Sequence, residues 1–306
     1  MNHSTDQTQY KVGTLFIKIL MVFCVLVLAI YFAKHFGTQY AEKKVQEQLD
    51  RSGLAPFVDY KTLHFNPFEI AVSLEDVSAG LASAPWLTFS RITLNYHPTQ
   101  PSHIDIDFWI KQSAAAELST ETQLWMRKAG IDTLLGKGSF SSLQQGESVT
   151  SELTIIIKDV GEIIGSSDIK LFDQNISMME LRTDMLASMA MGQPEGVFII
   201  HGDAVQIQSA RLAYTDMGLA KHVFPQQPDN RVIYGIIEKL GLAHQYSAEA
   251  EHIAKTVSHF FQSQNKTLIT EVSPSPPITL KDATLLISDK LLYKKTGMSI
   301  SNEALN

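Results

Sequence analysis

The sequence predicts an α+β protein with an N-terminal transmembrane helix, followed by antiparallel β-sheet with one wet face and packed helices. Three observations predict this fold. A long apolar segment lies near the start, several later segments alternate apolar and polar residues, and the last third carries apolar residues at helical spacing. Alternation with a period of two is typical of a half-buried strand, and a period of 3.6 is typical of an amphipathic helix.

Composition sets the broad class of the protein. The chain has 306 residues, of which 44% are hydrophobic and 19% are charged, and its formal net charge is −7. The hydrophobic fraction suffices for a packed core. The negative net charge argues against a surface that binds nucleic acid, because such a surface needs clustered Lys and Arg. The single cysteine, Cys24, lies in the apolar segment, which excludes an intramolecular disulfide and a Cys-based zinc site.

The apolar segment spans residues 12–36, VGTLFIKILMVFCVLVLAIYFAKHF. It has no charged side chain from Ile19 to Phe32. A bilayer core of ~30 Å needs roughly 20 apolar helical residues. We therefore predict an uncleaved transmembrane helix that contacts the lipid bilayer through residues 12–36 and follows a polar tail at residues 1–11.

Two other interpretations compete for this segment. A cleaved signal peptide needs small residues at the first and third positions before the cut. Cleavage after Ala33 places Tyr31 at the third position, and cleavage after Ala41 places Gln39 there, so neither cut fits. A lipoprotein needs a small residue before its modified cysteine, but Phe23 occupies that position.

The rest of the chain divides into two parts. Helical spacing predicts a juxtamembrane helix over residues 37–53, and an extracytoplasmic α+β domain follows over residues 54–306, with two lobes meeting near residue 140. More lysines follow the apolar segment than precede it, which by the positive-inside rule leans toward an outside amino terminus. The β-rich pattern is nevertheless common in envelope proteins. On that ground we expect a single-pass protein of the bacterial inner membrane with its large domain in the periplasm.

Periodicity predicts the individual elements. Alternating residues predict strands within 68–77, 86–96, 103–110, 152–160, 168–172 and 196–214. Helical spacing predicts helices over 112–135, 176–191, 229–240, 247–261 and 282–288. We expect Gly136 and Gly138 to end the first of these helices, and two short strands to flank the proline-rich residues 273–277.

One predicted helix carries an unusual number of methionines. Met178, Leu181, Met185 and Met189 recur at spacings of three, four and four within residues 176–191. Flexible, polarisable methionine side chains suit an apolar contact surface for an acyl chain or a partner helix. The alternative is an ordinary helix whose apolar face packs against the core.

The polar residues do not form a recognisable catalytic set. His103, Asp105 and Asp107 share one face of a predicted strand, a pattern that suits a metal but is also typical of a solvated face. Asp216 is either a base or a helix cap, and we expect His201 and Asp203, in a predicted strand, not to form a dyad unaided. The G-x-S-x-G, H-E-x-x-H and G-x-G-x-x-G motifs are missing from the sequence. We expect no enzyme activity, no metal and no cofactor.

A short segment resembles a known family. Asn66-Pro67-Phe68, followed by Ile70, Val72, Leu74 and Asp76-Val77, resembles the opening strands of AsmA-like bacterial envelope proteins. The resemblance covers about residues 12–110, and it implies an anchored protein with a role in lipid traffic or outer-membrane upkeep. The later segments 212–219 and 267–280 are similar to anchored proteobacterial proteins without an assigned activity. AsmA-like proteins are usually longer and have more strands.

These observations predict a membrane-anchored envelope protein that takes part in lipid handling or outer-membrane maintenance. An apolar sheet face joined to a membrane helix motivates this expectation. The alternative is a non-catalytic periplasmic scaffold or partner-binding module. The expected partners are the lipid bilayer and a lipid or protein of the envelope, with no nucleic acid.

Overall fold

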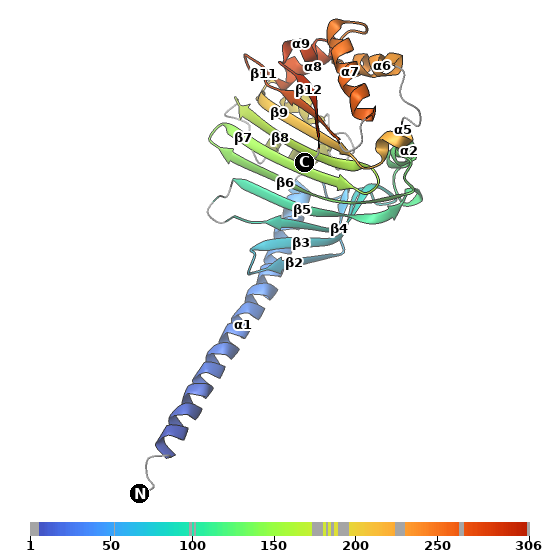
Figure 1. Ribbon diagram of the computed structural model, residues 1–306. Helices are drawn as coiled ribbons and strands as arrows, with labels where there is room; N and C mark the ends of the chain where they lie inside the picture. Colours follow the sequence, from blue (N-terminus) through green and yellow to red (C-terminus); the bar gives the residue numbers. More distant parts are fainter. Residues whose placement is uncertain are drawn as a thin grey trace.

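The computed structural model describes most of the chain (Figure 1). Its backbone description leaves out residues 1–5, 52, 98–99, 101, 173–179, 182, 185–186, 189–195, 224–229, 263–265 and 305–306. Side chains are also left out at residues 6–26, 29, 197–199, 230, 266 and 304.

The strands form one antiparallel sheet of 12 strands. From edge to edge the order is β1, β3, β4, β5, β6, β7, β8, β9, β10 and β12, while β2 also pairs with β3 and β11 with β9. Most neighbours in the sheet are neighbours in sequence, so the topology is a meander. The bounds are β1 (Val58–Asp59), β2 (Thr62–Asn66), β3 (Ala71–Leu81), β4 (Ala84–Asn95), β5 (His103–Ala114), β6 (Thr133–Gln145), β7 (Ser148–Ile157), β8 (Gly161–Leu171), β9 (Val205–Asp216), β10 (Lys266–Val272), β11 (Ile278–Thr279) and β12 (Ser299–Ala304).

The helices gather at the borders of the sheet. Figure 1 shows α6 to α9 together beside β12, and α2 and α5 at one end of the strands. The N-terminal part of α1 projects away from the sheet, and its C-terminal part lies beside β2 and β3. The bounds are α1 (Asp6–Arg51), α2 (Thr120–Ala129), α4 (Gly196–His201), α5 (Leu219–Val223), α6 (Asn230–Lys239), α7 (Ala248–Gln262), α8 (Leu280–Ser288) and α9 (Leu292–Lys295).

The predicted fold class requires a correction. Within the residues that the structure describes, no helix is long and apolar enough to cross a membrane. The predicted N-terminal transmembrane helix is therefore contradicted, and the fold is a mostly antiparallel β-sheet with several helices. The side chains of residues 12–26, most of the predicted segment, lie outside the described residues.

α1 is one continuous helix that ends at Arg51, close to the predicted end. Gly53 follows with a φ of 69°, a left-handed conformation that favours glycine and often ends a helix. Before that end, Ala41 packs against Leu63 of β2. The second half of α1 is thus fixed to one edge of the sheet.

Three segments predicted as helix or strand have the other secondary structure. Residues 112–114 and 133–135, predicted as helix, belong to β5 and β6, and residues 196–201, predicted as strand, form α4. Gly136 and Gly138 lie inside β6 and do not end a helix. A Cβ at Gly138 would collide with the Phe108 ring, so this glycine makes room for a side chain from β5. α4 contacts α8, a long-range contact that local alternation does not reveal.

The hydrophobic core consists of four clusters among the described residues, each formed between a helical segment and the sheet. α1 covers β2 and β3, α2 covers one end of the strands, and α6 and α7 cover β12. The fourth cluster joins helical Leu181 to three strands. Residue 140, where the sequence predicts that two lobes meet, lies inside β6, and the sheet continues through it.

Candidate functional site

The strand register separates the side chains into an apolar face and a polar face. Residues paired across antiparallel strands point to the same face, and neighbours along a strand point to opposite faces. Ile155 of β7 pairs with Gly138 and Ile163. The next residue, Ile156, pairs with Lys137 and Glu162 and therefore lies on the other face.

A row of large side chains crosses the apolar face from β4 to β9. Each pairs in register with the next, except that Gly165 of β8 interrupts the row. Two isoleucines of the adjacent row lie beside them. We call these side chains the central apolar strip: Leu94, Ile106, Phe140, Leu153, Leu212, Ile155 and Ile163.

The central apolar strip is partly open to solvent. Leu94 is 39% exposed and Leu212 is 50% exposed, and the other members are partly buried. The clusters at the borders of the sheet, as they are defined over the described residues, include none of the strip's side chains. Apolar area that stays in contact with water carries an unfavourable free energy that a bound apolar group would relieve.

Charge is distributed very unevenly between the two faces. From β4 to β9 the apolar face carries no Lys, Arg or Glu side chain in the part of the chain that the structure describes, and Asp216 at a strand end is its one carboxylate. The polar face carries Arg91, Asp105, Lys137 and Glu152. The apolar face therefore suits hydrocarbon and offers nothing to neutralise an anion.

Asp216 acts as a helix cap, as the second interpretation of the sequence predicted. Its carboxylate accepts hydrogen bonds from the backbone N–H of Gly218 at 3.3 Å and of Ala220 at 2.9 Å, at the start of α5. The Tyr214 hydroxyl lies 2.8 Å from the same carboxylate. Burial, followed by this hydrogen bond and the negative charge, raises the pKa of Tyr214 well above its usual value.

The three polar residues of β5 lie on the polar face, and each has its own partner. His103 is 3.0 Å from Ser141 Oγ, and His97 is 3.4 Å from the carboxylate of Asp105. Asn95 donates to Asp107 at 3.1 Å. Among the described residues, no group of three or more His, Cys, Asp or Glu side chains is arranged to hold a metal ion.

His201 has an acidic partner, but it is not the neighbouring Asp203. His201 Nε2 lies 2.7 Å from Asp184 Oδ2, and His201 is only 4% exposed. Asp203 instead forms an ion pair with Lys281 at 2.8 Å. The sequence could not reveal the first pair, because the two residues are 17 positions apart and belong to different elements.

The predicted methionine surface is described at only one position. Leu181 is helical and buried against Val149, Leu171 and Val205. This packing is what the alternative, a core-facing helix, requires at Leu181. Met178, Met185 and Met189 lie outside the described residues.

Sequence reasoning identified part of the strip. Alternation marked Leu94, Ile106, Leu153 and Ile155 as inward positions, but it missed Phe140, because its segment carries the glycines and serines typical of a loop. Comparison with known proteins gives no family: no family model matches the sequence, and no curated protein matches it either.

Proposed function

We propose that this is an envelope protein that works at a lipid bilayer and handles lipid by binding acyl chains on its central apolar strip. The role is lipid transfer or outer-membrane maintenance. One observation carries the proposal: large apolar side chains lie in register from β4 to β9, partly exposed, on a face where the described residues include no Lys or Arg side chain. The AsmA-like resemblance of the first strands supports the same role.

The length of the strip fits an acyl chain. Neighbouring strands are about 4.8 Å apart, so the five intervals from β4 to β9 span roughly 24 Å. One leaflet of a bilayer contributes about half of a hydrocarbon core of ~30 Å. An extended acyl chain could therefore lie across the strands without leaving the apolar face.

α1 supports a location at a membrane. Its described residues from 27 to 36 expose several large apolar side chains, among them Leu28, Tyr31 and Phe36. Its second half packs on β2 and β3, next to the β4 end of the strip. We propose that the chain contacts the bilayer through residues 12–36, at the bacterial inner membrane, with residues 54–306 in the periplasm.

Blocking the strip tests the proposal. Gly165 has no side chain, and a Cβ added there would meet its nearest neighbours at 3.8 Å, an ordinary contact. Gly165→Phe should therefore fold and place a ring over the strip. We expect lipid that co-purifies with the full-length protein, measured by mass spectrometry, to fall about tenfold or more, since a buried alkyl segment contributes about 0.8 kcal/mol per CH₂.

The matched control places the same ring on the other face. Ser166 is the next residue of β8, it is exposed, and it lies on the polar face opposite Arg211. Ser166→Phe should retain the lipid of the wild type. Equal lipid content in wild type and both variants, or equal loss in both variants, would count against acyl-chain binding on the strip.

A second candidate function has its own observation. α6 exposes Val232 and Ile236, and Leu240 directly after the helix is exposed at the same interval of four residues. Ile233 and Ile237 of the same helix are buried in the core instead. Exposed apolar side chains at this spacing suit the partner-binding module that the sequence left as the alternative. Replacing the three exposed residues with Ser should abolish cross-linking to an envelope protein under this alternative, and should leave the lipid content unchanged.

A further inference from the structure

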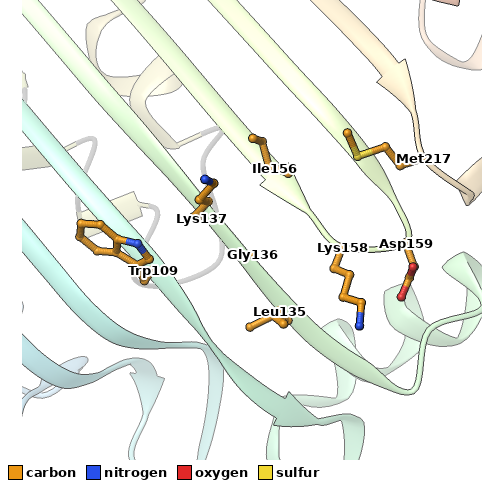
Figure 2. Close-up of a pocket in the computed structure, with 8 residues that line it drawn as sticks. All are labelled: Trp109, Leu135, Gly136, Lys137, Ile156, Lys158, Asp159 and Met217. Atoms are coloured by element: carbon orange, nitrogen blue, oxygen red, sulfur yellow. The ribbon is translucent and has the colours of Figure 1, made fainter. Parts of the chain in front are cut away.

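A depression lies on the polar face of the sheet, the face that does not carry the central apolar strip. Its volume is about 480 Å³, within the range of roughly 300–1,000 Å³ that is usual for small-molecule sites. Figure 2 shows the side chains around it, which come from β5, β6, the end of β7, the turn between β7 and β8, and the segment after β9. The lining residues are Trp109, Leu135, Gly136, Lys137, Ile156, Lys158, Asp159 and Met217.

Apolar groups interrupt the polar face at this depression. Trp109 and Ile156 lie on strands that otherwise present polar side chains to this face, and Met217 is 49% exposed beside them. Figure 2 places Trp109 at one side and Met217 at the other, with Gly136 between them. Water in this hollow contacts apolar surface that an aromatic or alkyl group would cover favourably.

Cations surround this apolar surface. The side chains of Lys137 and Lys158 are exposed, and no ion pair of either is found among the described residues. Arg91 lies over the Trp109 ring, with its Cζ 3.9 Å from the ring centre, so a third positive charge is held at the border. Three carboxylates lie near them: Asp159 in the lining, Glu162, which pairs with Ile156 across the strands, and Asp107, two residues before Trp109 on the same face of β5.

We propose that the depression binds a small amphipathic anion, with one phosphate group on an aromatic or alkyl body. The body covers Trp109, Ile156 and Met217, and the phosphate lies between the ammonium groups of Lys137 and Lys158. Lysine binds phosphate as a compact point charge, and the lining itself holds two ammonium groups against the one carboxylate of Asp159, which makes one anionic group favourable. This site is independent of acyl-chain binding, because the strip lies on the other face of the sheet.

Methyl NMR resolves the two faces. Ile155 reports on the apolar face, while Ile156 and Met217 report on the depression. The full-length chain, labelled with ¹³C at the Ile and Met methyl groups, would be titrated with phenyl phosphate, benzyl alcohol and inorganic phosphate. With phenyl phosphate we expect saturable shifts of the methyl signals of Ile156 and Met217, and no shift of the Ile155 signals. Benzyl alcohol and inorganic phosphate each lack half of the interactions, so we expect them to bind at least tenfold more weakly. A tenfold change in affinity corresponds to about 1.4 kcal/mol.

Two sets of variants test the charges in opposite directions. Lys137→Gln with Lys158→Gln should weaken phenyl phosphate binding about tenfold or more, and both side chains are exposed, so folding should be unaffected. Asp159→Asn removes a negative charge that repels the ligand, so it should strengthen phenyl phosphate binding about twofold. This variant should fold, because Asp159 has a φ of 62°, a conformation that Asn also tolerates. Equal affinity in the wild type and the lysine variant, or equal shifts of Ile155 and Ile156, would overturn the proposal.

Discussion

Gly165 of β8 lies directly opposite Leu212 of β9, and a Cβ added to Gly165 would lie 3.8 Å from Leu212 Cδ1. The glycine is therefore not required by steric crowding, unlike Gly138, where an added Cβ would press on the Phe108 ring. The missing side chain interrupts the central apolar strip. It leaves Leu212 half exposed, on the face to which we assign acyl-chain binding.

Gly165→Ala should stabilise the protein by about 0.5–1 kcal/mol, because glycine in a strand loses more conformational entropy on folding than alanine does. Gly138→Ala is the matched opposite case and should destabilise the protein by about 1–3 kcal/mol through overpacking. The free energy of unfolding from urea denaturation measures both. Destabilisation by Gly165→Ala would show that the space beside Leu212 is filled.

Leu181→Ala should destabilise the protein by about 2–5 kcal/mol, because Leu181 is 6% exposed and packs against the sheet in the same cluster as Val205. Leu212→Ala removes an equally large side chain that is half exposed, and it should cost less than about 1 kcal/mol. Urea denaturation compares the two variants. Similar losses would mean that Leu181 is not part of the core.

Stability should fall above pH ~10 in part through Tyr214. Burial and the charge of Asp216 raise the pKa of Tyr214 in the folded protein, whereas the unfolded chain loses this proton near pH ~10. The folded state then binds more protons than the unfolded state, so this contribution is complete below pH ~10 and is lost as pH rises beyond it. Tyr214→Phe should make the fall in midpoint temperature above pH ~10 shallower.

The control for Tyr214 is a tyrosine on the surface. Tyr96 is 55% exposed, and Tyr96→Phe should keep the pH dependence of the wild type. A fall in midpoint temperature that is equally steep in wild type and Tyr214→Phe would contradict the assignment to Tyr214.

The proposed location can be tested with a reporter that is active only outside the cytoplasm. Fused after Asn306, such a reporter should be active, because we place residues 54–306 in the periplasm. An inactive reporter in this fusion would contradict the periplasmic location.

Local pattern predicted individual elements better than their assembly. The alternation around Ile155 predicted β7, and helical spacing over 247–261 predicted α7, at whose start Ser247 Oγ accepts from Ala250 N at 3.1 Å. By contrast, the polar end of the chain gave no sign of β12, which pairs with β10 from Lys266 to Glu271. A strand of mixed polarity at the border of a sheet has little periodicity of its own, and the partner strand specifies it.

The sequence by itself determined which side chains of a strand share a face, because side-chain direction alternates with each residue whatever the strand pairs with. It also determined the approximate bounds of α6, α7 and α8. Only the tertiary structure decided the lateral register that aligns Leu94, Ile106 and Leu212 into one strip, and that brings Lys137 and Lys158 to one depression. Register and long-range contacts depend on the packing of segments far apart in the chain, and no local period records them.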